Sequence, residues 1–342
     1  MSICSDFLKE DVKFSVFADW WIESYCEKQL KERTIERYTQ FKKRTYDAFG
    51  ETPIKSIRAL DIQVFIDSLA NEGVNNRTGG GLSPKTICGY LGFVSDVMKY
   101  AWRLELIDAN PCSRVIAPKI TSKERVIYSE EQTQEFLYLL KDAPTQYQVF
   151  YQIAIFAGLR RGELLGLDWT DIDFKNSIIK VRKNSQYTKR KGMYSDKPKS
   201  LAGQRVLKLP QFLFASISRL RHEQVADFSA KEITWSEFTR LFTSEGGEPM
   251  HPNVPYNWLK RFCQKREIPF YGIHQFRHLN ASLLIYTGAD PTTVAHTLGH
   301  SKVSTTMNIY SHAFAYAQAM ASSAVSDVLV QRLSAKVPAH YF

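Results

Sequence analysis

The side chains in this sequence that could do chemistry are mostly cations, and the first pair lies in the segment GLRRGE. Arg160 and Arg161 follow an apolar run and precede three leucines. A guanidinium group stays charged at any accessible pH and binds phosphate oxygens in a bidentate manner. Glu163 lies three residues after Arg160, so a helix would place both on one face, where the carboxylate could orient the guanidinium. The segment suits an oxyanion site, with a structural arginine–glutamate pair as the alternative.

A second group of candidates lies in the segment HQFRH. A helix would place His274 and Arg277 on one face, and His274 and His278 are separated by four residues, as some zinc ligands are. The glutamate of the H-E-x-x-H zinc motif is missing, however, and Arg277 would repel a cation. His296 and His300 have the same spacing and also lack the glutamate. We therefore expect no metal site.

A tyrosine and a lysine complete the set. Tyr310 lies ten residues after His300, in TTMNIYSH, and Lys197 and Lys199 precede a β-like segment. Cations can hold the non-bridging oxygens of a phosphodiester and neutralise the charge that grows in the transition state, and a lysine can protonate the departing sugar oxygen. A tyrosine, with a pKa of about 10, needs such a field or a nearby base to become a nucleophile. The combination predicts metal-free attack by tyrosine on a phosphodiester.

The elements that must position these groups fall into two parts, which meet near residue 120 in the stretch NPCSRVIAPKITSKER. Apolar spacing predicts four helices in the first part. The first covers residues 14–30, Thr34 and Asp61 could cap the second and third, and Ser83-Pro84 should begin the fourth, which ends near Leu104. These helices predict a small bundle.

The second part mixes helices and strands. Ser129 begins a capping box, and residues 146–157 should form a buried helix. Residues 177–183 and 205–209 are β-like, separated by a long connection rich in Lys, Gly and Ser. Three nearby acids are expected to lie solvated in a turn before the first β-like segment: Asp168, Asp171 and Asp173. Further helices are expected from about residues 212, 255, 274, 291, 305 and 313.

Composition narrows the class of protein. The 342 residues correspond to about two domains, and 44% hydrophobic residues exclude a disordered chain. The net charge of +10 suits a polyanionic partner, and it is uneven: residues 1–120 hold 17 basic and 16 acidic side chains, and the remainder 28 and 19. No run approaches the roughly 20 apolar residues of a membrane span, and no secretion signal is present. Five scattered cysteines without C-x-x-C fit reduced thiols in the cytoplasm.

Taken as an ordered set, the segments AGLRRGELLGLDW, HQFRH, LGHS and TTMNIYSH resemble the tyrosine recombinases, or phage integrase family. The resemblance covers most of the chain. It implies that Glu163 is a supporting acid, that Lys199 fits the lysine position better than Lys197, and that Arg161 and His278 are not catalytic. Tyr286 and Tyr316 are the alternative nucleophiles to exclude. The catalytic set that the resemblance implies is Arg160, Lys199, His274, Arg277, His300 and Tyr310.

The same resemblance implies a mainly α fold with a small β-sheet. Residues 1–118 would form a helical, SAM-like domain that binds the core DNA site, and residues 122–335 a mixed α/β catalytic domain, followed by a tail at 336–342. The two domains would clamp duplex DNA. The candidate DNA contacts in the first domain are Lys42, Lys43, Arg44 and Lys85. The first three form a basic triplet, for which a solvated surface is the alternative.

The implied activity is cleavage and rejoining of double-stranded DNA through a 3′-phosphotyrosine, without ATP, cofactor or essential metal. It would integrate or excise a mobile element in the bacterial cytoplasm, at the nucleoid, with no membrane partner. The implied assembly is a homotetramer on two DNA sites, with an excisionase or a host DNA-bending protein as further partners. The segment after Ala313 would reach a neighbouring subunit, although its alanine-rich run from Ala313 to Ala324 would also suit docking within the same chain.

Three alternatives stay open: a resolvase or invertase of the same family, a type IB topoisomerase, and a non-catalytic DNA-binding regulator. Many phage and transposon integrases also carry an arm-site-binding domain before the first helix of the core-binding domain. Here about a dozen residues precede that helix. We therefore expect a simple recombinase, unless an arm domain lies outside this sequence.

Overall fold

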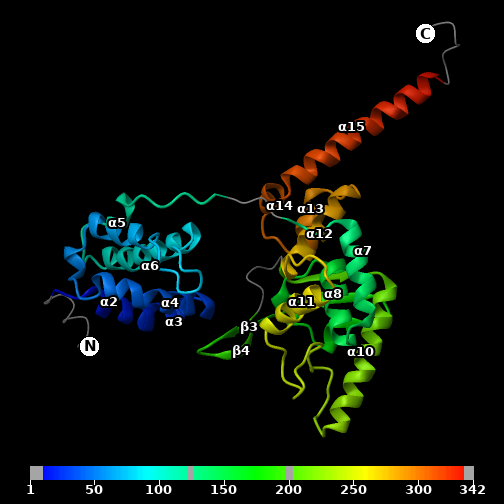
Figure 1. Ribbon diagram of the computed structural model, residues 1–342, viewed down its shortest axis with the longest axis horizontal. Coiled ribbons are helices and arrows are strands. Elements are labelled where there is room, and N and C mark those ends of the chain that lie inside the picture. Colours follow the sequence, from blue (N-terminus) through cyan, green and yellow to red (C-terminus); the bar gives the residue numbers. More distant parts are fainter. Residues whose placement is uncertain (1–10, 122–125, 197–202, 335–342) are drawn as a thin grey trace. The chain divides into compact units, whose positions relative to one another are not determined.

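The computed structural model describes residues 11–121, 126–196 and 203–334 (Figure 1). By its internal contacts the chain divides into two compact units. The first comprises Met1–Glu124 together with Thr188–Lys191, and the second comprises Arg125–Tyr187 together with Gly192–Phe342. Both units are built mainly from helices, and the strands form one three-stranded and one two-stranded sheet. The predicted fold class, mainly α with a small β-sheet, is confirmed.

The first unit is a helical bundle around an aromatic core. Phe14, Phe17 and Phe93 are fully buried in it, and Phe14 meets Phe49 edge to face with ring centroids 5.0 Å apart. Such aromatic packing stabilises a bundle of this size because each ring buries a large apolar area. The elements are α2 (Phe14–Trp21), the π-helix η1 (Ile22–Cys26), α3 (Glu27–Gln29), α4 (Glu32–Phe49), the 3₁₀ turn η2 (Ile54–Ser56), α5 (Ala59–Ser68), α6 (Pro84–Arg103) and the 3₁₀ turn η3 (Pro111–Arg114).

Local capping decides where these helices begin. The Oγ of Ser83 accepts a hydrogen bond from the backbone N–H of Thr86, which confirms the predicted start of α6. Two other predicted caps are wrong. Helix α4 begins two residues before Thr34, because Lys31 is the last extended residue. Asp61 lies inside α5, where its carboxylate reaches back to accept the N–H of Arg58 in a capping box.

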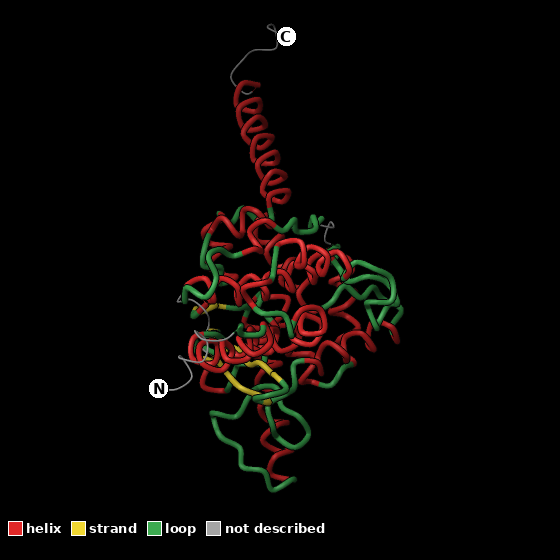
Figure 2. The backbone as a smooth tube through the Cα atoms, turned by 90° about the vertical axis from the view of Figure 1, so that its left-hand side faces the viewer, coloured by secondary structure: helices red, strands yellow, loops and turns green. Residues whose placement is uncertain are grey.

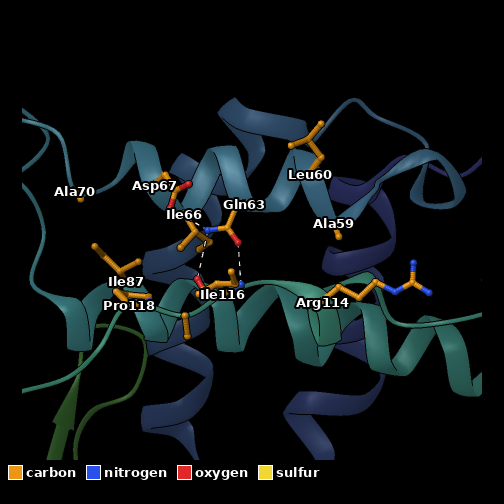
Figure 3. Close-up of a pocket in the computed structure, with 11 residues that line it drawn as sticks. Ala59, Leu60, Gln63, Ile66, Asp67, Ala70, Ile87, Arg114, Ile116 and Pro118 are labelled. Carbon is orange, nitrogen blue, oxygen red and sulfur yellow. Dashed lines mark hydrogen bonds between the residues drawn. The ribbon is translucent and has the colours of Figure 1, made fainter.

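An open groove of about 730 Å³ lies in the first unit between α5 and the chain that follows η3 (Figure 3). Gln63 holds one wall, because its side chain donates to the carbonyl of Ile116 and accepts the Ile116 N–H at 2.8 Å. The lining is largely apolar and contains none of the predicted catalytic side chains: Ala59, Leu60, Gln63, Ile66, Asp67, Ala70, Ile87, Arg114, Ile116, Ala117 and Pro118.

The second unit packs its helices around α8, which is buried on most sides and contacts both α10 and α12. The capping box at Ser129 and the buried helix at residues 146–157 are confirmed. The helices are α7 (Glu130–Leu139), η4 (Leu140–Asp142), α8 (Thr145–Ala157), α9 (Arg161–Leu164), η5 (Trp169–Asp171), α10 (Gln211–Ala230), α11 (Asn253–Lys265), α12 (Ile273–Tyr286), α13 (Pro291–Leu298), α14 (Val303–Ile309) and α15 (Ser311–Ser334).

The strands of the second unit form a small antiparallel sheet in the order β1-β2-β5, with Ile179 opposite Leu207. The two predicted β-like segments are therefore neighbours. A hairpin of β3 and β4 lies in the connection between them and was not predicted, because its residues are mostly polar and do not alternate with apolar ones. The strands are β1 (Ile172–Asp173), β2 (Ile178–Val181), β3 (Asn184–Thr188), β4 (Gly192–Asp196) and β5 (Arg205–Lys208).

The expectation that the acids before the sheet are solvated is wrong for two of the three. The side chains of Asp168 and Asp171 are each 1% exposed and form ion pairs with Lys183 and Arg182, respectively. Burying a carboxylate requires such partners, and the turn into β3 supplies them. Asp173, at the end of β1, is half-buried and accepts hydrogen bonds from Asn176. The buried pairs fix the sheet to the loop that precedes it.

Helix α15 begins on the second unit and then extends away from it (Figure 2). Phe314 and Ala317 in its first turns pack against a small cluster that includes Tyr310. On the same helix, Tyr316 and Met320 are 57% and 56% exposed. None of the helices that the structure describes combines the length and the apolar composition that crossing a membrane requires.

Candidate active site

The Arg160–Glu163 pair predicted from the sequence is present at the end of α8. That helix ends at Gly158, whose φ of +58° is left-handed and turns the chain toward α9. Glu163 accepts the backbone N–H of Arg160 at 3.0 Å and its guanidinium Nη1 at 2.7 Å. The Arg160 side chain is 40% exposed, whereas that of Glu163 is 5% exposed. The carboxylate is thus a buried anchor for a guanidinium that can still reach a ligand.

The guanidinium of Arg277 ties two helix ends together. From α12 it donates through Nη1 to the carbonyl of Gly158 at 2.8 Å and through Nη2 to that of Leu298 at 2.5 Å. Arg160 donates to the carbonyl of Gly299 at 3.2 Å, so the two arginines meet the same turn after α13. Burial, and then the charge of Arg160, lower the pKa of Arg277 to about 9. Arg277 therefore stays charged near neutral pH.

His300 is placed by a second left-handed glycine, Gly299, which ends α13 with a φ of +65°. Its Nδ1 lies 2.8 Å from the hydroxyl of Thr306 on α14. Burial lowers the pKa of His300 to about 4, helped by the charges of Arg277, Arg160 and Arg205. The imidazole is therefore neutral at pH 7, and in this neutral form its Nε2 can hydrogen-bond a ligand.

Arg205 is a member of the site that sequence reasoning missed. It begins β5, its side chain is fully buried, and its Nη2 donates to the second oxygen of Glu163 at 2.9 Å. Its Nε donates to the carbonyl of Thr297 at 2.7 Å, just before the turn that places His300. The signal was an arginine at an inward position of the strand, two residues from the buried Leu207. Arg205 therefore joins the sheet, Glu163 and α13.

Glu163 is charged because two arginines share it. Burial of the carboxyl opposes ionisation, but the charge of Arg205, its hydrogen bond and the charge of Arg160 outweigh burial and lower the pKa of Glu163. Together with Arg277, the cluster contains three guanidinium groups and one carboxylate. An excess of fixed positive charge in a partly dry site is the arrangement that binds a phosphate group.

Tyr310 ends α14 with its side chain 6% exposed, and its hydroxyl lies 2.8 Å from Nδ1 of His278 on α12. The negative charge of an ionised Tyr310 would raise the pKa of Arg277, so the hydroxyl is within electrostatic range of the cluster. His274, one turn earlier on α12, is exposed, and its ring lies perpendicular to that of His278 with centroids 4.9 Å apart. His278 is a second group that sequence reasoning left out of the site.

The other predicted residues have varied positions. Lys197 and Lys199 lie outside the described residues, between Asp196 at the end of β4 and Gly203, whose carbonyl accepts from Arg205 at 3.3 Å. Tyr286 and Tyr316, the alternative nucleophiles, are each more than half exposed and pack edge to face, with centroids 5.4 Å apart. Within the described ranges, no group of three potential ligand side chains could hold a metal ion.

The predicted DNA contacts of the first unit differ in their exposure and in their partners. Lys42 forms an ion pair with Asp19 at 2.6 Å, and Arg44 donates to the carbonyl of Val74. Lys43 and Lys85 are exposed. The basic triplet is therefore not a continuous exposed face.

Comparison with known protein families finds two matching models. The Phage integrase family matches residues 127–316, and the phage integrase N-terminal SAM-like domain matches residues 13–70. Among curated relatives, the ICEBs1 integrase of Bacillus subtilis is 26% identical over 283 residues, which cover 83% of this chain and 74% of the relative.

Solved structures share the fold. The Tn1549 transposon integrase in complex with transposon right end DNA is similar with a TM-score of 0.73 at 22% identity, covering 87% of this chain and 95% of that one. A lambda integrase tetramer bound to a Holliday junction is similar with a TM-score of 0.61 at 16% identity, covering 88% and 81%. The fold of the chain is thus one that occurs in proteins crystallised on DNA.

Proposed function

The chain belongs to the phage integrase family, the tyrosine-type site-specific recombinases, and on this basis we propose that it cleaves and rejoins double-stranded DNA at Tyr310 to integrate or excise a mobile element. The observation that carries the proposal is the cluster of Arg160, Arg205 and Arg277 around one carboxylate, within electrostatic range of the buried hydroxyl of Tyr310. The names of two similar proteins, the ICEBs1 integrase and the Tn1549 transposon integrase, support the mobile-element role.

In the proposed reaction, Arg160 and Arg277 bind the non-bridging oxygens of the scissile phosphate, and neutral His300 hydrogen-bonds the same group. The oxygen of Tyr310 forms a bond to phosphorus as the bond from phosphorus to the 5′ oxygen breaks. The phenol proton leaves to water, and Lys199 supplies one to the 5′ oxygen. The products are a 3′-phosphotyrosine and a free 5′-hydroxyl, and attack by the hydroxyl of a partner strand reverses the step.

His274 and Glu163 complete the site in different ways. His274 is exposed on the same helix as Arg277, where it can contact the DNA phosphate. Glu163 is a positioning residue, because it holds Arg160 through one carboxylate oxygen. Arg205 acts one step farther away: it holds Glu163 through the other oxygen and contributes its charge to the cluster. This chain of contacts keeps the Arg160 guanidinium in one orientation before DNA binds.

The partners that we propose are duplex DNA and three further copies of the chain. Lambda integrase has been crystallised as a tetramer on a Holliday junction, which supports this assembly. In the present chain, α15 extends away from the second unit (Figure 2). Its residues Tyr316 and Met320 are exposed, as those of a helix that docks on a neighbouring subunit would be. Lys43 and Lys85 are the exposed candidates for phosphate contacts in the first unit.

A nicked suicide substrate tests the nucleophile. The DNA would be taken from the junctions of the mobile element that carries the gene, with a nick placed so that the cleaved 5′ fragment diffuses away and the covalent adduct accumulates. Wild-type protein and the Tyr286→Phe and Tyr316→Phe controls should form the adduct, whereas Tyr310→Phe should not. An adduct with Tyr310→Phe would refute the assignment.

Efficient relaxation of a supercoiled plasmid that lacks the element's junctions would instead indicate a topoisomerase. A recombinase should require its own site, because it transfers the cleaved strand to a partner strand in a second, matching site. Relaxation is measured by gel electrophoresis of the plasmid with wild-type protein and with Tyr310→Phe.

A further inference from the structure

Tyr310 and His278 contact each other, and both residues are buried. The two side chains are 6% and 5% exposed, and the hydroxyl oxygen lies 2.8 Å from Nδ1. Thirty-two residues separate them in sequence, so the pairing depends on how α14 packs near α12. Buried polar groups are nearly always hydrogen-bonded, because an unpaired one pays its full desolvation cost. The fold thus gives the hydroxyl of Tyr310 a partner outside the arginine cluster.

The described charges beside this contact are mostly positive. His278 directly follows Arg277, a residue that is 2% exposed and interacts electrostatically with Arg160, Arg205 and Tyr310. Glu163 is the one carboxylate among the groups that interact most strongly with Arg277. A second proton on the His278 ring would add positive charge to a site that already has an excess of it. In a singly protonated imidazole, one ring nitrogen carries the proton and the other is an acceptor.

We propose that His278 is a positioning residue for the nucleophile, a role that rests on the proposed function of Tyr310. With its proton on Nε2, the ring accepts the O–H of Tyr310 at Nδ1 and fixes the hydroxyl beside the arginine cluster before DNA arrives. When the phenol proton leaves to water, its hydrogen bond to Nδ1 breaks, so His278 has the same protonation state before and after the step. It differs in this from Arg160 and Arg277, which bind the phosphate, and from Lys199, which supplies a proton.

Three substitutions separate this role from packing and from proton transfer. The Oδ1 of asparagine is as many bonds from Cβ as Nδ1 of histidine, so His278→Asn keeps an acceptor at the same place and cannot take a proton. His278→Gln carries the same amide one bond farther out, near the position of Nε2. His278→Leu keeps an apolar side chain of similar size and removes the acceptor.

The readout is the single-turnover rate of adduct formation on the nicked substrate at saturating DNA. We expect His278→Asn to lose less than about tenfold, and His278→Leu and His278→Gln to lose about 100-fold, the size of effect that misplacing a reacting group produces. DNA affinity should be the same for all three, because none removes a phosphate contact. A His278→Asn variant as slow as His278→Leu, or a His278→Leu variant as fast as the wild type, would overturn the positioning role.

A spectroscopic measurement tests the same contact without altering His278. In ¹⁵N-histidine-labelled protein, the Nδ1 of His278 should have the chemical shift of an unprotonated acceptor and should move in Tyr310→Phe, while Nε2–H stays. A proton on Nδ1 in the wild type would overturn the proposal even if His278→Leu fails to fold.

The two proposals fail in different ways. If Tyr310→Phe still forms the adduct, the nucleophile assignment is wrong. If Tyr310→Phe is inactive and His278→Asn is no faster than His278→Leu, the nucleophile stands and the positioning role is refuted.

Discussion

Glu163 and Arg205 form an ion pair of 2.9 Å in which the side chains are 5% and 0% exposed. They lie 42 residues apart, one on the short helix α9 and the other on β5. Because Glu163 also holds Arg160, this pair connects the sheet to a guanidinium that we propose binds DNA phosphate.

Arg205→Met should lower the free energy of unfolding by about 3–5 kcal/mol, because it leaves a buried carboxylate with one half-exposed partner. Chemical denaturation of the full chain measures the change. Arg219→Met is the matched control, since Arg219 pairs with Glu223 on α10 and both are 52% exposed, a setting in which ion pairs contribute about 0–1 kcal/mol. Equal losses in the two variants would contradict the structural role of Arg205.

Arg277→Lys should slow single-turnover cleavage by about 100-fold or more, the effect of removing one preorganised donor from a site that stabilises developing charge. A lysine ammonium cannot donate to the carbonyls of Gly158 and Leu298 in the fork geometry that Arg277 uses. Arg161→Lys, at the neighbouring arginine position that we leave out of the catalytic set, should lose far less. Because both variants keep the positive charge, an Arg277→Lys variant that cleaves as fast as Arg161→Lys would indicate that charge, rather than the fork, matters.

Gly158→Ala should lower the stability of the protein by more than the cost of a left-handed conformation alone. That conformation costs a non-glycine residue about 1–2 kcal/mol, and a Cβ at Gly158 would also lie 2.6 Å from Oδ1 of Asn280. Gly192→Ala, at a φ of +67° with no atom within 4 Å of the added Cβ, bears the conformational cost alone. Thermal unfolding of both variants gives the difference. If Gly192→Ala is the more damaging change, the close approach of α8 to α12 is not as described.

His300 should make stability depend on pH in the acid range. Its pKa is lowered from 6.5 to about 4 in the folded protein, so the unfolded chain binds the proton more readily. The free energy of unfolding therefore falls as the pH is lowered from about 6.5 to about 4. Subtracting the profile of His300→Gln from that of the wild type isolates this dependence. His222→Gln, at an exposed histidine of α10, serves as the control, and a flat difference profile for His300→Gln would contradict the prediction.

Much of the helical framework follows from the sequence because its signals are local. The cap at Ser83, the capping box at Ser129 and the apolar run at residues 146–157 each act within a turn or two of helix. The ordered motifs likewise identify the family, since they consist of residue types at fixed spacing. The contact between Arg160 and Glu163 was predictable for the same reason: the two lie within one turn of a short helix.

Only the tertiary structure decides which distant groups meet and which groups are buried away from water. Arg277 reaches the carbonyl of Gly158 across 119 residues, and Tyr310 reaches His278 across 32. Asp171, expected in solvent, is buried because the turn into β3 brings Arg182 to it. The energy of a charge or a hydroxyl depends on its desolvation and on its partners, and both are set by packing between elements rather than by spacing along the chain.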